Sequence, residues 1–434
     1  MRDAAVPAVR WLTPDAHEAL LARLARAGTL VAPVDVDGEA VFRPVRDPAR
    51  ILHDLVNTLV PPRDLFLPSP ETLLAYRIED GAPRVVDGGH DAGGAAPERV
   101  VYGIRPCDVA GLAYLERLLS GAPFARPDLA DAPFARRRAA ATLLCVTCDA
   151  PGDTCACVCC GGGPALEEGF DWQLTRLARG WLVEIGSARG EALAARVADL
   201  LAPPPPGSAG EKAARVRETV ARFHEGSARR VPTMAASRMV SAGRLGEAFW
   251  TEVGERCSEC GGCAFVCPTC SCFNVADVRP PGEAPFEPRG AGDVPAVPGG
   301  PLAAVADGTY LRVRTRDGCT LAGFVRQAGG GYPRWTCGER CLTRFFHKLS
   351  AQFHARLGAP GCTGCGRCIV VCLGEEGIDR VAQGMEAALL AGRGRAGAAG
   401  EAPPLGAPRA ARAAHGPAAP PPAAASGPPA EAAR

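Results

Sequence analysis

Lysine is almost absent from this chain, since Lys212 and Lys348 are the only two among 434 residues. Arginine supplies nearly all of the positive charge, and Ala, Gly and Pro are abundant, which indicates a bias in base composition before it indicates a function. Neither sign of charge is in excess, with 48 basic against 47 acidic residues. The chain therefore has no overall electrostatic preference for nucleic acid or for an anionic membrane, and we expect neither as a partner.

Long apolar runs are missing as well. No uninterrupted apolar stretch approaches the roughly 20 residues that a helix needs to cross a bilayer, so we expect no membrane insertion. The first 30 residues carry Asp3, Asp15 and Glu18 without an apolar core segment, which argues against a secretory signal peptide. These absences favour the cytoplasm, where thiols stay reduced. The 20 cysteines are therefore interpreted as metal ligands or redox thiols rather than as disulfides.

The chain divides into regions of different pattern. Helical stretches such as 17–27 alternate in the first 200 residues with short β-like runs such as 29–36 and 181–185, which predicts a sheet covered by helices. The C-terminal residues have too few large apolar side chains to offset the entropy of ordering. The predicted α+β organisation comprises an N-terminal α/β domain with a cysteine-rich insertion (1–200), a helical connector (201–250), a mainly helical ferredoxin-type dicluster domain (251–385) and a disordered Ala/Pro/Gly-rich tail (386–434).

Eight cysteines form two copies of one pattern. In each copy, three cysteines are separated by two residues and a fourth follows after three more. This is the spacing of bacterial two-cluster ferredoxins, in which three thiolates hold one [4Fe-4S] cluster and the fourth ligates the other. The spacing therefore predicts two [4Fe-4S] clusters, one held by Cys257, Cys260, Cys263 and Cys372 and the other by Cys362, Cys365, Cys368 and Cys267.

Structural zinc is the alternative for these two runs. Zinc sites also use thiolates, but usually as two Cys-x2-Cys pairs that a dozen or more residues separate. Four cysteines within 11 residues, repeated twice, fit that arrangement poorly. The first run ends in Pro268, as the ferredoxin pattern does, whereas Leu373 follows the second run. Because this proline shapes a turn and binds no iron, we expect a changed turn and a retained cluster.

Twelve further cysteines have no ferredoxin spacing. Those in the N-terminal region are Cys107, Cys145, Cys148, Cys155, Cys157, Cys159 and Cys160. Spacing alone leaves two interpretations of this group open, a further iron–sulfur cluster and buried or reactive thiols. The remaining five could be core thiols, neighbours of a cluster or additional ligands: Cys270, Cys272, Cys319, Cys337 and Cys341.

Several motifs that are unrelated to the ferredoxin spacing occur in a fixed order. They are Val-Tyr-Gly-Ile-Arg-Pro-Cys-Asp at 101–108, Cys-Asp-Ala-Pro-Gly-Asp-Thr-Cys-Ala-Cys at 148–157, Cys-Pro-Thr-Cys-Ser-Cys-Phe at 267–273 and Gly-Cys-Thr-Gly-Cys-Gly-Arg-Cys at 361–368. With these motifs, about residues 10–385 resemble the beta subunit family of cytoplasmic sulfhydrogenases, which includes the corresponding subunit of anaerobic sulfite reductase.

The resemblance implies a function. In that family the subunit is an electron relay, since a separate flavin-binding subunit handles NAD(P)H and a separate catalytic subunit performs hydrogen or sulfur chemistry. The resemblance implies that this chain conducts electrons between such subunits and is non-catalytic by itself. It also implies a third cluster, with the ligands Cys107, Cys148, Cys155 and Cys157. We expect no flavin or nicotinamide on this chain, because it lacks a Gly-x-Gly-x-x-Gly fingerprint between a strand and a helix.

Other interpretations stay open at this stage. The chain could serve another flavin-linked oxidoreductase, or it could be a scaffold or redox sensor in which clusters or zinc hold the shape without conducting. Cys337 and Cys341 depart from the family pattern, and so do Cys159 and Cys160. Among other residues, an ion pair is predicted between Arg105 and Asp108. A helix predicted over 341–357 places His347 and His354 near one face, as buried or solvated histidines rather than iron ligands.

Overall fold

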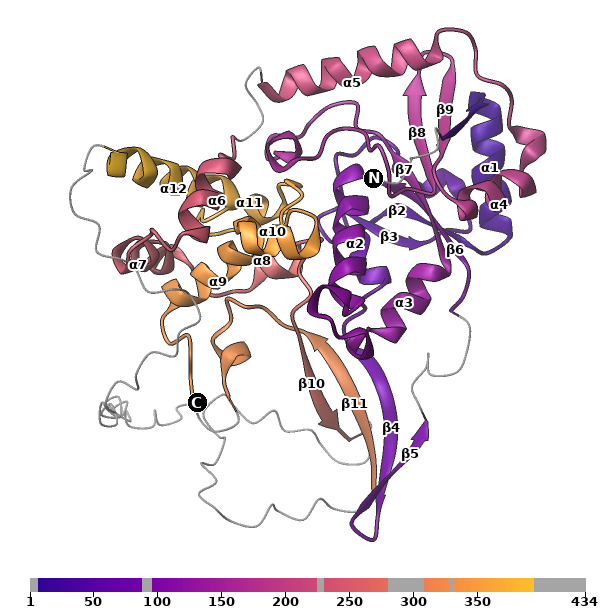
Figure 1. Cartoon of the computed structure of the whole chain (residues 1–434). Helices are drawn as coiled ribbons and strands as arrows, with labels where there is room; N and C mark the ends of the chain where they lie inside the picture. The colour runs from indigo at the N-terminus through magenta and orange to yellow at the C-terminus, as the bar shows by residue number, and fades with distance from the viewer. Residues whose placement is uncertain (1–6, 88–95, 225–229, 280–307, 328–330, 394–434) are drawn as a thin grey trace, which may run out of the picture. The chain divides into compact units, whose positions relative to one another are not determined.

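The computed structural model describes residues 7–87, 96–224, 230–279, 308–327 and 331–393. A seven-stranded mixed sheet occupies the N-terminal part of the chain (Figure 1). Its central strands β2, β6, β7 and β8 are parallel, and the strands outside them are antiparallel. In spatial order the strands are β1 (Ala8–Leu12), β9 (Gly180–Ile185), β8 (Trp172–Leu177), β7 (Ala141–Val146), β6 (Arg99–Ile104), β2 (Leu30–Val36) and β3 (Glu39–Pro44).

Buried apolar runs account for the parallel centre of this sheet. Every residue of β7 is buried, as is most of β6, which is the pattern of parallel strands that helices cover on both faces. Helices α1 (Pro14–Arg26) and α4 (Ala188–Arg196) pack on the face that carries Leu144. Helices α2 (Pro106–Leu119) and α3 (Ala132–Ala139) pack on the opposite face, which carries Leu143. The predicted mixture of helices and strands is confirmed.

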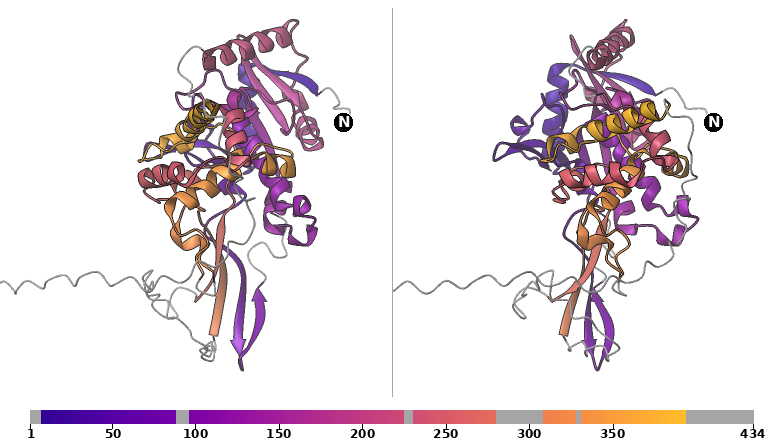
Figure 2. Two further views of the ribbon diagram at one scale, coloured as in Figure 1. Left: turned by 60° about the vertical axis from the view of Figure 1, so that its left-hand side comes forward. Right: turned by 90° about the vertical axis from the view of Figure 1, so that its left-hand side faces the viewer.

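A second, four-stranded antiparallel sheet joins distant parts of the chain. In both views of Figure 2 the purple strands β4 and β5 lie beside the salmon strands β10 and β11. Tyr76 pairs with Tyr310 across this sheet, and their rings stack with centroids 5.5 Å apart. The pairing crosses the predicted boundary between the α/β and dicluster regions. The strands are β10 (Phe273–Val278), β11 (Gly308–Arg316), β4 (Glu71–Glu79) and β5 (Ala82–Asp87).

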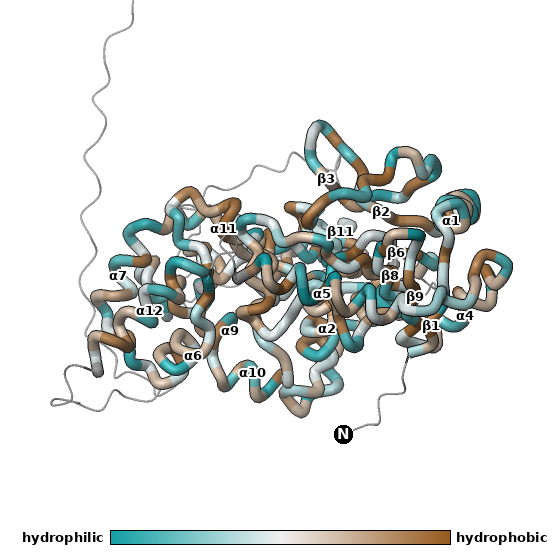
Figure 3. Tube along the Cα trace, turned by 90° about the horizontal axis from the view of Figure 1, so that it is seen from above, coloured by the Kyte–Doolittle hydropathy of each residue, from teal (hydrophilic) through white to brown (hydrophobic). Residues whose placement is uncertain are grey.

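The remaining described helices gather around an apolar core that contains Trp250, Phe345 and Met385. Several alternate hydrophilic and hydrophobic segments along the tube in Figure 3, as helices with one face on a core do. None of the described helices is long and apolar enough to cross a bilayer. These helices are α5 (Ser208–His224), α6 (Thr233–Ser241), α7 (Glu247–Arg256), α8 (Gly262–Phe265), α9 (Cys337–Leu349), α10 (Ala351–Leu357), α11 (Arg367–Val370) and α12 (Ile378–Arg393). Short 3₁₀ helices are η1 (Pro48–Arg50), η2 (Pro62–Leu65), η3 (Ala122–Phe124), η4 (Pro127–Leu129), η5 (Cys157–Cys160), η6 (Ala198–Leu200) and η7 (Ala322–Val325).

Two details of the predicted organisation need correction. The helix predicted over 341–357 is broken at Ser350, whose backbone is extended and whose side chain caps α10 by accepting a hydrogen bond from the Phe353 amide. His347 and His354 therefore lie on different helices. Helix α12 also continues beyond 386, where the tail was predicted to begin, because Ala388 and Leu389 pack on the core that holds Met385. Residues 394–434, the rest of the predicted tail, lie outside the described residues.

Candidate metal centres

The thiols predicted to hold the second cluster line one cavity of about 380 Å³. One thiol comes from the first cysteine run and three come from the second: Cys267, Cys362, Cys365 and Cys368. The cavity wall also includes the side chains of Arg344 and Lys348 from α9. Four sulfur donors around one cavity, shared between two runs in this way, suit the ligand exchange of a two-cluster ferredoxin.

Glycines allow the loop of the second run to approach the N-terminal region closely. Gly364 and Gly366 have positive φ angles of 64° and 79°, and a Cβ atom at either position would collide with the backbone of residues 154–157. The amide of Ala156 donates a hydrogen bond to the carbonyl of Gly364 over 2.8 Å. The loop that carries the second run therefore packs directly against the cysteine-rich insertion.

Two buried cations face the same cavity. Lys348 is 8% exposed, and its ammonium donates a hydrogen bond over 2.6 Å to the Thr269 hydroxyl, which lies 3.2 Å from the Cys267 sulfur. Arg344 is 4% exposed, and its Nε atom has no hydrogen-bond partner within the described part of the chain. Neither cation pairs with a carboxylate of the described residues. Because burying an unpaired charge is costly, these cations fit a site at which thiolates and a metal cluster carry negative charge.

The thiolates determine the charge of both cations. Burial lowers the pKa of Lys348, but the thiolates of Cys267 and Cys270 raise it by more, so this pKa lies well above its ordinary value. Burial likewise lowers the pKa of Arg344, and the thiolates of Cys263 and Cys368 outweigh that effect. Both side chains therefore remain positively charged wherever the thiols are ionised or bound to metal.

The thiols predicted for the first cluster are less closely gathered. Cys263 and Cys372 interact electrostatically, and the Cys372 sulfur accepts a hydrogen bond over 3.1 Å from the amide of Glu376. Cys260 is exposed at the surface. Cys257, at the end of α7, lies instead beside two thiols of α9, as described below.

The four thiols implied for a third cluster lie at one end of the central sheet. Cys107 is in the first turn of α2, and Cys148 follows β7. Burial raises the pKa of Cys148 to about 11, with a further contribution from Cys155. Burial raises the pKa of Cys157 to about 12, and both Cys148 and Cys155 contribute. These mutual effects show that the thiols are near neighbours, and Cys107 is coupled in the same way to Cys148.

The predicted ion pair between Arg105 and Asp108 is wrong. Asp108 pairs with Arg367 of the second cysteine run, at distances of 2.6 and 2.9 Å. Arg105 instead donates to backbone carbonyls at the end of β7 and in the loop before α2, among them Thr147 and His53. The extended backbone of Arg105 at the start of α2 directs its side chain under these loops, while Asp108 lies one turn further along the helix.

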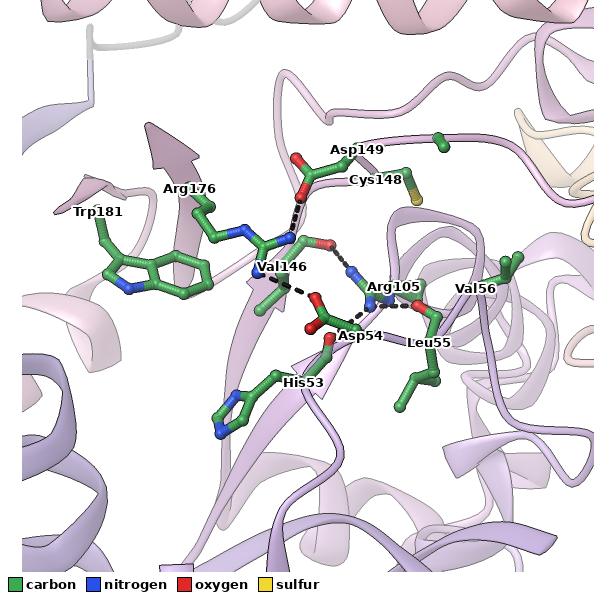
Figure 4. A pocket seen from close by; sticks show the side chains of 11 residues that line it. His53, Asp54, Leu55, Val56, Arg105, Val146, Cys148, Asp149, Arg176 and Trp181 are labelled. Atoms are coloured by element: carbon green, nitrogen blue, oxygen red, sulfur yellow. Dashed lines mark hydrogen bonds and ion pairs between the residues drawn. The ribbon is translucent and has the colours of Figure 1, made fainter. Parts of the chain in front are cut away.

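A pocket opens at the carboxyl ends of β6 and β7, beside Cys148 (Figure 4). Arg176 and Arg105 both line it. Arg176 forms ion pairs of 2.9 Å with Asp54 and with Asp149, whereas the buried Arg105 has only carbonyl partners and a free Nε within the described residues. Uncompensated positive charge thus lies next to the thiol group implied for a third cluster.

Tertiary structure also pairs cysteines that the spacings left unassigned. The sulfur of Cys160 lies 3.9 Å from that of Cys362. Cys272 and Cys319 are in side-chain contact, as are Cys267 and Cys270. On α9, Cys337 and Cys341 have the i, i+4 spacing of one helix face, but the helix predicted from the sequence began only at Cys341 and so excluded this pairing.

Comparisons with known proteins agree with a metal-binding interpretation. Residues 303–375 match a family described as a 4Fe-4S dicluster domain, and this match includes the second cysteine run. Over 357 residues the chain is 27% identical to sulfhydrogenase 2 subunit beta of Pyrococcus furiosus, an alignment that covers 81% of this chain and 90% of that protein. No solved structure matches the chain significantly. The resemblance to sulfhydrogenase beta subunits is thereby confirmed, and the dicluster match indicates iron–sulfur clusters.

Proposed function

We propose that this chain is an iron–sulfur subunit that relays electrons between two partners. One partner is a flavin-binding subunit that exchanges electrons with NAD(P)H, and the other is a terminal hydrogenase or sulfite/sulfur reductase subunit. The similarity to a sulfhydrogenase beta subunit supports this proposal, as does the match to a dicluster domain. The observation that carries it is the cavity in which Cys267 of the first run faces three cysteines of the second.

The proposal includes three ligand sets. The first two are those that the ferredoxin spacing predicts, and the third is the set that the family resemblance implies. Bound [4Fe-4S] clusters accept and donate single electrons, while the chain holds them, limits their contact with water and sets their potentials. The buried cations of α9 serve the last purpose, since Lys348 and Arg344 place positive charge where reduction adds negative charge. The proposed ligand sets are Cys257, Cys260, Cys263 and Cys372; Cys362, Cys365, Cys368 and Cys267; and Cys107, Cys148, Cys155 and Cys157.

A relay also requires short distances between its ligand loops. The hydrogen bond from Ala156 to Gly364 and the buried pair of Arg367 with Asp108 hold the second cysteine run against the third group. The first run reaches the same region through Cys267. These contacts support a continuous path within one chain, which needs no catalytic residue of its own.

The metal content of the full chain, purified without oxygen, tests the proposal first. About 12 irons and 12 sulfides per chain support all three sets, and about eight of each support the two ferredoxin-type sets alone. Zinc in place of iron, without sulfide, would leave a structural metalloprotein. The relay itself is tested by adding NAD(P)H together with the flavin-binding subunit and recording electron paramagnetic resonance spectra. Clusters that stay oxidised in that complex would favour a scaffold or a redox sensor.

A further inference from the structure

Three thiols meet at the junction of α7 and α9. The sulfurs of Cys257, Cys337 and Cys341 all lie within 4.8 Å of one another. Cys341 is buried, and the other two are half-buried. The ferredoxin spacing includes only Cys257, so the proposed function leaves two members of this thiol trio without a role.

The sequence builds half of the trio into one helix. Thr336 caps the start of α9, and Glu339 completes a capping box with it, so that the helix begins at Cys337. Residues four apart on a helix lie on the same face, one turn above the other. Cys337 and Cys341 therefore present both thiols toward α7.

Close packing of the two helices brings the third thiol to them. A Cβ atom at Gly254 would lie 2.6 Å from the backbone nitrogen of Gly338, and a Cβ atom at Gly338 would collide with the backbone of Trp250. Only glycine at both positions permits this approach, which places Cys257, at the end of α7, beside α9. An ion pair of 2.6 Å between Arg340 and Glu259 holds the following loop in the same position.

The separation of the sulfurs suits one metal ion. Zinc–sulfur bonds of about 2.3 Å in tetrahedral geometry place two thiolates about 3.8 Å apart, which is within the span of the trio. Thiols that serve one cubane bind different iron atoms and must stand further apart. An all-thiolate donor set selects soft metal ions, and half-burial of two members leaves room for water as a fourth ligand.

A buried cation balances the charge that such a site would carry. Three thiolates and one divalent ion leave a net negative charge. Arg344 lies three residues beyond Cys341 on α9 and interacts electrostatically with Cys257 and Cys341. No carboxylate of the described residues competes for this guanidinium. The surroundings of the trio are therefore compatible with an anionic metal–thiolate centre.

We infer that Cys257, Cys337 and Cys341 form a three-thiolate site for a single soft divalent metal ion such as Zn²⁺. The inference goes beyond the proposed electron relay and rests on it in one respect, because Cys257 is also a proposed ligand of the first cluster. A thiolate sulfur keeps lone pairs after it binds one metal, so Cys257 bridges the ion and that cluster.

Metal analysis of single variants tests this site. The full chain is produced with iron and zinc both supplied and is purified without oxygen. We expect about one zinc per chain in the wild type, and loss of that zinc in Cys337→Ser and in Cys341→Ser while iron and sulfide stay unchanged. Cys159→Ser, which changes a cysteine outside the trio, is the matched control and keeps the zinc. In protein loaded with Co²⁺, the thiolate-to-cobalt absorption band should follow the same pattern.

Each other outcome is decisive. Zinc in the wild type that does not exceed the level in both variants overturns the inference. Loss of iron together with zinc in Cys341→Ser would make Cys341 a cluster ligand and would overturn it as well. Absence of iron from the wild type would refute the electron relay, yet the zinc comparison between the wild type and the variants would still decide the thiol site.

Discussion

Arg367 and Asp108 form a buried ion pair in which both nitrogen–oxygen contacts are short, at 2.6 and 2.9 Å. Their side chains are only 1% and 2% exposed. Arg367 lies between two cysteines of the second run, and Asp108 follows Cys107. The pair therefore joins the proposed ligands of two different clusters through one charge contact.

Removal of the Asp108 charge should destabilise the protein strongly. Asp108→Asn leaves the Arg367 guanidinium buried without a counter-charge, a change that typically costs about 3–5 kcal/mol. Thermal or urea unfolding of the metal-loaded full chain measures this loss. Asp199→Asn breaks the exposed pair with Arg23 and should change little, because water solvates both partners. Equal effects of the two variants would show that burial does not determine the strength of the first pair.

Replacement of one ferredoxin-type cysteine should remove one cluster. Cys365→Ala, and separately Cys260→Ala, should each lower the iron content by about four per chain. Because metal binding and folding are coupled, the unfolding temperature should fall with the iron content. Cys159→Ala serves as the control with unchanged iron. Full iron content in Cys365→Ala would contradict the assignment of the second run.

Neutralisation of Lys348 should make a cluster harder to reduce. At an effective dielectric constant of about 20 and a separation of about 7 Å, loss of one positive charge costs about 2.4 kcal/mol, which corresponds to a potential lower by on the order of 100 mV. Redox titration of Lys348→Met, followed by electron paramagnetic resonance, measures the shift. Lys212→Met is the matched control, because Lys212 pairs with Glu184 in another part of the chain. Equal potentials in the wild type and Lys348→Met would exclude this role.

Acid should destabilise the protein in part through His17. Burial lowers the pKa of His17 to about 4, and the charge of His53 contributes. A lowered folded-state pKa means that the neutral ring stabilises the fold above the ordinary pKa of 6.5, and that this stability is lost as the pH falls from 6.5 toward 4. Between pH 7 and 5.5 the loss from this residue should be about 1 kcal/mol.

His17→Gln keeps a hydrogen-bonding group for the Tyr102 hydroxyl but does not titrate. Unfolding measured at both pH values should therefore show a smaller loss in this variant than in the wild type. His354→Gln changes an exposed histidine and should leave the pH dependence as it is. An unaltered pH dependence in His17→Gln would refute the contribution of His17.

Local pattern determined much of this protein. The ligand spacing of the two cysteine runs is a property of short loops, so the sequence alone indicates an iron–sulfur protein. Helix and strand periodicity likewise predicted α5 and β2 to within a few residues. The predicted ligand sets remain predictions, and the structure adds to them the cavity that Cys267 shares with the second run.

Only the tertiary structure decided which distant residues meet. Pairing of β4 with β11 depends on residues more than 200 positions apart, for which no periodicity in either segment gives a sign. Asp108 has a nearer arginine in the sequence, yet the fold pairs it with Arg367. Cys257 lies beside Cys337 and Cys341 because two glycines let α7 and α9 pack closely, and such a contact arises from packing rather than from spacing.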